Sequence, residues 1–347
     1  MKNHPLQAYW DLAAAAVQAE ALSAALTLGI FEPLVESLTA DELAGRLGLN
    51  AGNTAHLLKL LWSMGLLERS PRPALDHRES AEPTYRLAAL ARTYFLSTSP
   101  QWSGDAWHYR EARLGQVAGL LREQVRQGAQ AEGGQALDRF AKQWVAAARG
   151  QLAQDQLAAT APAALEAMSH VPEFASATHL LDLGGGPGWV AIELARQQAG
   201  LSGVVYDFPQ AVAVAAENIA AAGLAERLGV LGGDLATDDI GSGYDLIWCS
   251  SVLHFVPDVE AALKKMHAAL RPGGVLVCAH AEIGNDPAAA AQVLQYYLPM
   301  LMQGRNVGQQ GDMAAALKRV GFVYIESFIS GMFPMAPLTV VIGRKAV

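Results

Sequence analysis

The segment at residues 179–197, HLLDLGGGPGWVAIELARQ, constrains the fold of this chain most strongly. Its apolar run ends at Asp182, and a helical pattern begins near Trp189. The turn between them carries Gly184, Gly185, Gly186 and Gly188. A strand, a glycine-rich turn and a helix N-terminus, in this order, mark the place where open parallel sheets bind nucleotides. The segment therefore predicts a parallel sheet with a ligand site at the carboxyl end of its first strand.

The rest of the C-terminal half repeats this alternation of strand and helix. Short apolar runs are separated by helical patterns, in the order THLLDL, LSGVVYD, RLGVLGGD, YDLIWCSS and GGVLVCAH. Such repetition implies right-handed crossovers and a parallel sheet with helices on both faces. The tail, FVYIESFIS and then PLTVVIGRK after a Gly/Pro turn, predicts a terminal antiparallel pair. The expected class is α/β, with a mostly helical N-terminal domain before the sheet.

Residues 1–100 have a different pattern. Residues 10–37 are rich in Ala and Leu with helical periodicity. Thr39 and Glu42 have capping-box spacing, and Gly48 ends the short helix that they begin. A second apolar stripe follows, and the runs LLER and TYRL read as two short strands that flank a Pro-containing turn. Helix, turn, helix and a two-stranded wing predict a winged-helix domain.

A winged helix either binds DNA or serves as a packing and dimerisation element. The candidate recognition helix, GNTAHLLKLLWSMG, carries one Lys and no Arg, whereas insertion into a DNA groove needs several cations or amides. The chain has 25 Lys and Arg against 33 Asp and Glu, a net charge of -8, which opposes attraction to phosphate backbones. We therefore expect a dimerisation domain and no nucleic-acid partner. Its subunit interface is expected to contain Leu22, Leu26, Ile30 and Phe31.

Composition also bears on the cellular location of the protein and on whether it binds a metal. No apolar stretch free of charge is long enough for a transmembrane helix, and the N-terminus, MKNHPLQAYWDL, lacks a signal-peptide core. We therefore expect a cytoplasmic protein with no membrane partner. Cys249 and Cys278 lie in apolar, strand-like runs, which is typical of reduced core residues. No CxxC, HExxH or other ligand spacing occurs in the sequence, so no metal is expected.

The spacing of glycines and carboxylates narrows the ligand class. Gly184, Gly186 and Gly188 form GxGxG rather than the GxGxxG of dinucleotide-binding turns. Asp207 closes the second strand, 19 positions after Gly188, and Asp234 closes the third. Carboxylates at strand ends accept hydrogen bonds from ribose hydroxyls, and these motifs hold no basic residue that would neutralise a phosphate. The pattern favours a nucleoside with an uncharged sugar.

These motifs together resemble a known family. LLDLGGGPG, VVYDFP, GGDL, SSVLHFVPD and LRPGGVLV occur in the order and spacing of S-adenosylmethionine-dependent class I methyltransferases, specifically the O-methyltransferases with an N-terminal winged-helix dimerisation domain. TADELAGRLGL with LLKLLWSMGLLE resembles their N-terminal module, and MLMQGRNVGQQGDMAAALKRVGF resembles their last helical stretch. The family includes plant caffeate- and flavonoid-type enzymes and bacterial enzymes of antibiotic pathways.

The resemblance implies a Rossmann-like methyltransferase sheet, S-adenosylmethionine as cofactor with S-adenosylhomocysteine as product, and a homodimer formed through the N-terminal domain. It divides the chain into a winged-helix dimerisation domain at 1–100, a helical connector that contributes to the pocket at 101–172, and a catalytic domain at 173–347. In the plant enzymes a Lys near the cofactor's carboxylate stands at the position of Ser250. The residues implied to bind the cofactor are Asp182, Gly184, Gly185, Gly186, Asp207, Phe208, Gly233, Asp234, Leu235, Cys249 and Ser250.

His254, in SSVLHFVPD, occupies the position of the family's general base. An imidazole with an ordinary pKa of about 6.5 can accept the proton of a phenol whose pKa is about 10 during in-line methyl transfer. Plant members orient this base with a Glu after the next strand, whereas this chain has His280 there and Glu282 two residues later. His280 could orient His254 as a neutral acceptor or itself take the proton, and Glu282 could substitute for it. All three residues are catalytic candidates.

Aromatic and Met residues gather where the acceptor pocket is expected. Such stripes form core more often than they contact ligands, and both interpretations stay open here. If several residues line the pocket, the acceptor is a flat, largely apolar aromatic molecule with a hydroxyl group. The expected pocket residues are Trp107, His108, Trp144, Phe255, Tyr297, Met300 and Met302, with Trp248 and Tyr296 in the same cluster.

The predicted function is S-adenosylmethionine-dependent O-methylation of a small phenolic or heteroaromatic secondary metabolite. Members of the same family that methylate nitrogen, sulfur or carbon are the nearest alternative, and homologues that bind the cofactor without transferring its methyl group are another. A winged-helix transcriptional regulator with a ligand-sensing sheet domain is the alternative from a different class.

Overall fold

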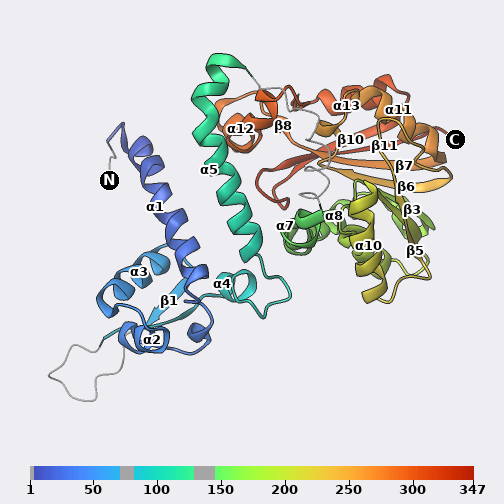
Figure 1. Cartoon of the computed structure of the whole chain (residues 1–347). Coiled ribbons are helices and arrows are strands. Elements are labelled where there is room, and N and C mark those ends of the chain that lie inside the picture. Colours follow the sequence, from blue (N-terminus) through green and yellow to red (C-terminus); the bar gives the residue numbers. More distant parts are fainter. Residues whose placement is uncertain (1–3, 71–81, 129–144) are drawn as a thin grey trace. The chain divides into compact units, whose positions relative to one another are not determined.

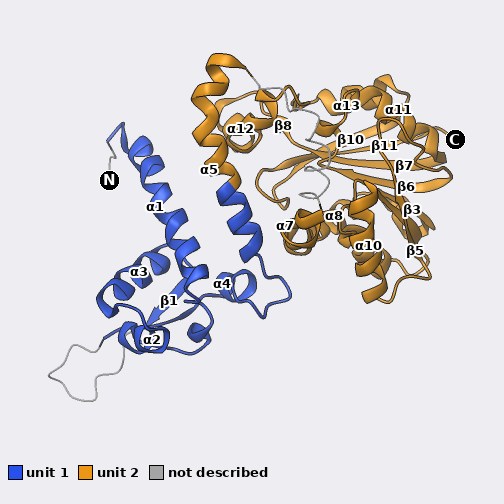
Figure 2. Ribbon diagram, viewed as in Figure 1, with its two compact units in different colours: residues 1–112 blue, residues 113–347 orange. Residues whose placement is uncertain are grey.

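The structure, a computed structural model, describes residues 4–70, 82–128 and 145–347. The chain divides into two compact units, Met1–Ala112 and Arg113–Val347 (Figure 2). The predicted connector at 101–172 is shared between them, because the boundary falls within helix α5 (Gly104–Gln127). Among the described residues, no helix has both the length and the apolar character needed to cross a membrane.

The first unit is mostly helical and carries a small antiparallel sheet of β1 and β2. The predicted capping box is confirmed, because Thr39 and Glu42 each accept a hydrogen bond from the other's backbone N–H. The helix that follows ends at Gly48, which has a left-handed φ of 67°. The elements are α1 (Gln7–Thr27), the 3-10 helix η1 (Pro33–Val35), α2 (Ala40–Leu47), α3 (Ala51–Ser63), β1 (Leu67–Ser70), β2 (Thr84–Leu87), α4 (Ala89–Tyr94) and the start of α5 (Figure 1).

The apolar residues that we expected at a subunit interface lie in the core of this unit. Leu22, Ile30 and Phe31 are buried within the chain, and Leu26 packs against the same cluster. The expectation was wrong because a domain core and an interface core are both apolar, so residue type alone does not separate them. The large apolar side chains that α1 exposes lie in its first half, at Tyr9, Trp10, Leu12 and Val17.

The second unit alternates helices with the strands of one large sheet. Its helices are α7 (Gln151–Asp155), the π-helical turn η2 (Gln156–Thr160), α8 (Ala161–Met168), η3 (Pro172–Ser176), α9 (Trp189–Gln197), α10 (Pro209–Ala221), η4 (Leu253–Phe255), α11 (Val259–Ala269), α12 (Pro287–Met302) and α13 (Asp312–Arg319). Its strands are β3 (His179–Leu183), β4 (Ser202–Asp207), β5 (Leu228–Gly232), β6 (Tyr244–Ser250), β7 (Leu270–His280), β8 (Glu282–Ile283), β9 (Gly308–Gln309), β10 (Val323–Ser330) and β11 (Leu338–Arg344).

The large sheet has seven strands in the order β10-β11-β7-β6-β3-β4-β5. The five strands from β3 to β7 run parallel, whereas β11 pairs antiparallel with both β7 and β10. The predicted parallel strands and the terminal antiparallel pair are therefore confirmed, and the unit is α/β. Helices cover both faces of the sheet: α8, α9 and α10 contribute to one core, and α11 and α13 contribute to the other (Figure 1).

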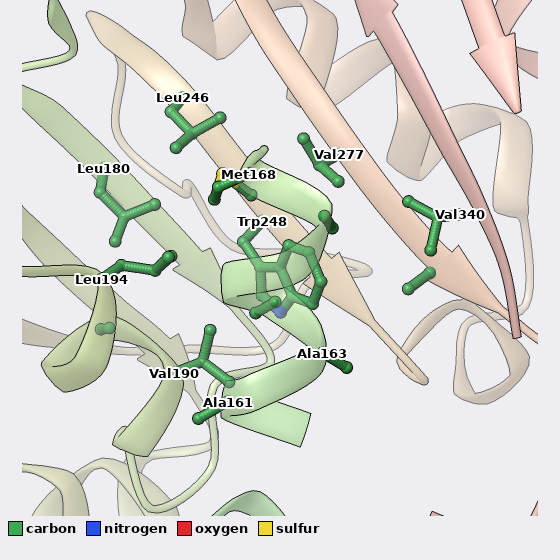
Figure 3. Close-up of a cluster of buried hydrophobic side chains, with 14 of the residues drawn as sticks. Ala161, Ala163, Met168, Leu180, Val190, Leu194, Leu246, Trp248, Val277 and Val340 are labelled. Carbon is green, nitrogen blue, oxygen red and sulfur yellow. The ribbon is translucent and has the colours of Figure 1, made fainter. Parts of the chain in front are cut away.

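The larger core lies on the face covered by α8 and α9. Trp248 of β6 is buried in it, close to Leu180 of β3, Val277 of β7 and Met168 of α8 (Figure 3). The indole stacks on Phe333 with ring centroids 6.3 Å apart. Of the two interpretations open for the aromatic cluster, the core interpretation therefore applies to Trp248.

The turn after β3 packs directly against the loop after β6. Gly184 has a left-handed φ of 71°, and a Cβ added to it would collide with Cγ2 of Val252. Glycine is the residue that allows both this backbone conformation and so close an approach. Because Val252 stands two residues before His254, the contact joins the glycine turn to the candidate catalytic loop.

We expect Gly184→Ala to destabilise the second unit more than Gly223→Ala does. Both glycines have a φ of 71°, so the strain of a left-handed alanine, roughly 1–2 kcal/mol, is common to the two variants. Nothing lies within 4 Å of a Cβ on Gly223, whereas displacement of Val252 adds about 1–3 kcal/mol in Gly184→Ala. Denaturant titration compares the free energies of unfolding, and equal losses in the two variants would refute the close packing.

Candidate active site

The glycine turn is tied to the neighbouring strand β4. The carboxyl ends of β3, β4, β6 and β7 meet at one edge of the sheet, so the loops that follow them share one space. The backbone N–H groups of Gly184 and Gly185 donate to the carbonyl of Tyr206 at 2.7 and 3.2 Å. The N–H of Gly186 donates to Oδ2 of Asp207 at 2.8 Å. The shape of the turn is therefore set by the end of β4.

Asp182 lies buried beneath the turn. Its Oδ2 accepts a hydrogen bond from the backbone N–H of Ala191 in α9 at 3.2 Å. A Cβ on Gly185 would come within 2.6 Å of the same oxygen, so the turn also needs a glycine there. Burial raises the pKa of Asp182 to about 7, against the effect of the Ala191 hydrogen bond and with a smaller contribution from the charge of Asp207. The carboxyl group thus holds the start of α9 and is only partly ionised at neutral pH.

Gln156 completes the turn, and no sequence motif pointed to it. Its Nε2 donates to the carbonyl of Gly185 at 3.0 Å, and its Oε1 accepts from the N–H of Trp189 at 2.9 Å. It begins the π-helical turn η2, a local widening of the helix that changes the direction of a side chain. The segment AQDQLAATAP has no pattern that distinguishes such a turn from an ordinary helix. Gln156 therefore joins both sides of the glycine turn from a third part of the chain.

The end of β4 offers a carboxylate beside apolar side chains. Asp207 is buried, and its Oδ1 accepts from the N–H of Phe208 at 2.7 Å. A carboxylate has about four acceptor positions, so it can take further hydroxyl donors. Phe208 is 36% exposed. Leu235, just after the carboxyl end of β5, is buried, and Asp234 beside it is exposed. The N–H of Gly233 donates to the carbonyl of Asp207 at 3.0 Å. These groups fit a ribose that carries a flat base.

Cys249 and Ser250 form the end of β6. Cys249 is buried opposite Cys278 of β7, and a hydrogen bond between the two thiols, together with burial, raises the pKa of Cys249. The prediction that both cysteines are core residues is confirmed. Because its thiol is in the core, Cys249 can reach a ligand only through its backbone, whereas Ser250 is half-buried at the strand end.

His254 lies on η4, the short 3-10 helix after β6, with 5% of its surface exposed. Burial, followed by the positive charge of Arg305, lowers its pKa to about 4, although a hydrogen bond with the Ser251 backbone opposes the shift. The imidazole is therefore neutral at physiological pH and has a lone pair that can accept a proton. Three rings meet it edge-on, with centroid distances of 4.8 Å for Phe255 and 5.7 Å for His280 and Tyr297.

His280, the last residue of β7, is buried beside His254. Its Nε2 accepts hydrogen bonds from the backbone N–H groups of Val252 at 3.1 Å and Leu253 at 2.9 Å. A ring nitrogen that accepts two such bonds carries no proton, so Nδ1 carries it. That Nδ1 has no partner among the residues that the structure describes. Burial and the neighbouring His254 hold the pKa of His280 well below its usual value. The basic nitrogen of His280 thus binds the backbone of the loop that leads to His254.

Glu282 and Asp312 serve the start of α13. Glu282 accepts hydrogen bonds from the N–H of Gly311 at 3.0 Å and from that of Met313 at 2.8 Å. Asp312 accepts one from the N–H of Gln309 at 2.7 Å. Because each carboxylate oxygen of Glu282 already has a backbone donor, Glu282 acts as a helix cap. The sequence did not reveal this role, since the two amides lie far along the chain from Glu282.

Two of the predicted pocket residues surround the candidate base. Phe255 is adjacent to His254 in the chain, and Tyr297 reaches the same ring from α12. Burial raises the pKa of Tyr297, so its hydroxyl stays protonated. Met300 packs against the edge of the larger core, and Met302 is half-buried at the end of α12. The structure therefore brings together Phe255, Tyr297 and His254 and places the methionines on the same helix as Tyr297.

The other predicted pocket residues lie elsewhere in the chain. Trp107 and His108 belong to the first unit, where the indole of Trp107 donates to Oγ of Ser23 at 2.8 Å and packs against that unit's core. Trp144 lies outside the described residues. Across the part of the chain that the structure describes, no cluster of three or more His, Cys, Asp or Glu is arranged to hold a metal ion.

Comparison with known proteins identifies both halves of the chain. The profile of the O-methyltransferase domain matches residues 142–323, and that of the O-methyltransferase dimerisation domain matches residues 10–97. The chain is 28% identical over 303 residues to the 3-hydroxy-5-methyl-1-naphthoate 3-O-methyltransferase of Streptomyces sahachiroi. The aligned region covers 85% of this chain and 84% of that protein. It is 27% identical over 311 residues to the N,N-dimethyltransferase OxyT of Streptomyces rimosus, with 88% and 87% covered.

The fold is also that of solved methyltransferases. The crystal structure of human N-acetylserotonin methyltransferase in complex with S-adenosylmethionine superimposes with a TM-score of 0.76 and 20% identity, over 100% of this chain and 99% of that one. The edge of the sheet that carries the glycine turn, Asp207 and His254 lies within the matched O-methyltransferase domain. Since that domain covers more than half of the chain, the protein belongs to the O-methyltransferase family and is a methyltransferase that uses S-adenosylmethionine.

Proposed function

We propose that this protein transfers a methyl group to a hydroxyl of a small aromatic secondary metabolite, phenolic or heteroaromatic. The observation that carries the proposal is the buried, neutral imidazole of His254, enclosed by the rings of Phe255 and Tyr297. Aromatic walls suit a flat acceptor, and a neutral imidazole suits a hydroxyl group that must lose its proton. The relative from Streptomyces sahachiroi acts, by its name, on a hydroxyl group of a naphthoate.

We propose that the cofactor lies along the edge between the glycine turn and the end of β4. Gly184 and its neighbours line its methionine end, Asp207 accepts the ribose hydroxyls, and Asp234 and Leu235 flank the adenine. The loose packing at Gly186 supports this placement, because a Cβ there would make only ordinary contacts, the nearest with Nε2 of Gln156 at 3.8 Å. When bound, S-adenosylmethionine supplies a methyl carbon that its positively charged sulfur makes electrophilic.

In this proposal His254 is the general base. The acceptor hydroxyl would donate to the free ring nitrogen of His254, which would take the proton as the carbon–oxygen bond forms. The bond between the methyl carbon and the sulfur would break in the same in-line displacement, with neutral S-adenosylhomocysteine as the leaving group. Phe255 and Tyr297 hold the acceptor ring and exclude water. Because the pKa of His254 is only about 4, the imidazole cannot ionise a phenol in advance. Proton transfer is therefore coupled to formation of the carbon–oxygen bond.

Methyl transfer from isotopically labelled S-adenosylmethionine to a matched phenol, aniline, thiophenol and carbon acid tests the acceptor. We expect a labelled aryl methyl ether, because the imidazole is placed to remove a hydroxyl proton. Labelled product from the aniline alone would show that the protein methylates nitrogen instead of oxygen, as the name of the relative OxyT says of that enzyme. Binding of the cofactor without any labelled product would indicate a homologue that does not transfer methyl groups.

His254→Ala is expected to lower kcat for the phenol by about 10²- to 10⁴-fold, the usual contribution of a general base. His267→Ala, which alters a ring packed on Phe322, serves as control. Because the pKa of His254 is lowered to about 4, its base form persists as the pH falls. We therefore expect kcat/KM to stay level down to about pH 5, and a decline centred near the ordinary histidine value of about 6.5 would contradict the buried base.

We propose that His280 positions His254 through the backbone of the loop and does not itself act as base. The two N–H groups that its Nε2 accepts, from Val252 and Leu253, support this role. His280→Gln supplies an amide oxygen that can accept both groups, whereas His280→Ala leaves two buried donors unpaired, at about 1–3 kcal/mol each. We expect kcat to fall at least 10-fold in the alanine variant and only a few-fold in the glutamine variant, with rescue of the pH profile. Equal losses of kcat in both variants would instead indicate that His280 itself takes the proton of the acceptor hydroxyl.

We propose a homodimer formed through the first unit. The dimerisation-domain match and the apolar side chains on the first half of α1 support it, since Tyr9, Trp10, Leu12 and Val17 are 51–73% exposed. Exposed apolar patches of this kind mark protein–protein contacts. Light scattering of the native protein should give twice the chain mass of 36.7 kDa.

Trp10→Glu combined with Leu12→Glu is expected to yield the monomer, because two buried charges disfavour association. Ile329→Glu, an equally exposed apolar position on β10, is the control and should leave the mass unchanged. A dimer that persists in the double variant would place the interface elsewhere.

A further inference from the structure

Arg305 lies between α12 and β9, beside the candidate base. Its Nε donates to Oε1 of Gln303 at 3.3 Å, and its guanidinium carbon is 5.0 Å from the centre of the Phe255 ring. The next residue, Asn306, donates through Nδ2 to the carbonyl of Val256 at 2.9 Å. These contacts join the segment that carries Arg305 to the loop that carries His254, and they hold the guanidinium against the aromatic wall of the site.

Among the described residues, no carboxylate forms an ion pair with Arg305. Arg149, Arg271 and Arg344 each form an ion pair with a carboxylate. In contrast, Nη1 and Nη2 of Arg305 have no acceptor among residues 4–70, 82–128 and 145–347. The positive charge acts on the active site, since it contributes to the lowered pKa of His254. The guanidinium carbon lies over the Phe255 ring, and a contact of this kind does not use the N–H groups at Nη1 and Nη2 as hydrogen-bond donors to the chain.

We propose that Arg305 binds a carboxylate carried by the acceptor, so that the substrates are hydroxylated aromatic carboxylic acids. The planar fork of a guanidinium matches a carboxylate through two parallel hydrogen bonds, which makes a carboxylate the preferred partner over a neutral oxygen. The inference rests on the proposed function for the hydroxyl group and adds a second recognition element beside it.

The cofactor also carries a carboxylate, at its methionine end, but the contacts of Arg305 favour the acceptor. Its contacts are with Gln303 at the end of α12 and with Phe255, whose ring meets His254 edge-on. None of its hydrogen bonds or ring contacts in the described structure involves the glycine turn at Gly184–Gly188.

Pairing of Arg305 with a carboxylate of the acceptor also changes the pKa of His254. The positive charge of Arg305 is one of the causes that keep the pKa of His254 low. An anion bound at Arg305 cancels that charge, so the imidazole becomes a stronger base when the correct acceptor is seated. Recognition of the carboxylate and removal of the hydroxyl proton are therefore linked through one electrostatic contact.

The test uses hydroxynaphthoic acids that differ in the position of the carboxylate, each paired with its primary amide, which has nearly the same shape and no charge. Dissociation constants are measured in the presence of S-adenosylhomocysteine, and kcat/KM is measured with S-adenosylmethionine. We expect the native protein to prefer at least one acid over its amide by roughly 10- to 100-fold, the usual strength of a charge-assisted pair. Arg305→Gln should abolish this preference by raising the dissociation constants of the acids roughly 10- to 100-fold, with a smaller change in those of the amides.

Two further variants separate recognition from folding. Arg305→Lys keeps the charge without the fork and should retain only part of the preference. Arg319→Gln removes a guanidinium from the surface of α13 and should retain all of it. A preference for the acids that survives Arg305→Gln, or its absence from the native protein, would overturn the proposal. A lowered thermal midpoint in Arg305→Gln, with acids and amides weakened alike, would also overturn it.

The same measurements distinguish the carboxylate's source and the underlying function. 5′-Methylthioadenosine lacks the amino-acid end of S-adenosylhomocysteine. If Arg305→Gln weakens binding of S-adenosylhomocysteine but not of 5′-methylthioadenosine, and binding of the acids is unchanged, the guanidinium binds the cofactor and the proposal fails. If the acids bind in an Arg305-dependent way but are never methylated, the carboxylate subsite stands and the proposed O-methylation fails.

Discussion

The active site depends on the close approach of two loops at one edge of the sheet. Gly184 has no side chain, so Val252 from the loop after β6 can lie directly against the turn after β3. The same turn is held from its other side by the carbonyl of Tyr206 and the carboxylate of Asp207. Parallel strands bring these loops together because all their carboxyl ends lie at the same edge. The position of the glycine turn relative to the loop that carries His254 is therefore set by these contacts.

Two neighbouring imidazoles, His254 and His280, differ in their hydrogen bonds. The Nε2 of His280 accepts two backbone N–H groups and is unavailable to a substrate, whereas His254 keeps a free lone pair. Burial keeps both rings neutral, since a charged imidazole loses its hydration there. In this chain, His280 is held by two backbone N–H groups of the loop that leads to His254. The positive charge of Arg305 contributes to the lowered pKa of His254, which is why we propose that an anion bound there changes its basicity.

Local signals in the sequence were sufficient for much of the fold. The capping box of Thr39 and Glu42, the short apolar strands and the terminal antiparallel pair all depend on residues close together in the chain, and each is present. Signals of residue type alone did less well. Leu22 and Trp248 are apolar and were open to an interface or a pocket, but both lie in cores. Burial of an apolar side chain lowers the free energy wherever it occurs, so its type does not tell which surface covers it.

The sequence by itself determined the class of fold, the glycine turn and the order of the strand ends that carry Asp207 and His254, because these follow from local periodicity and spacing. Only the tertiary structure decided the partners of the polar side chains. It placed Gln156 across the glycine turn, used Glu282 to cap α13, and set the guanidinium of Arg305 over Phe255, next to His254 in the chain. A hydrogen bond or an ion pair depends on distances of a few ångströms between residues far apart in the chain, and these distances exist only once the chain has folded.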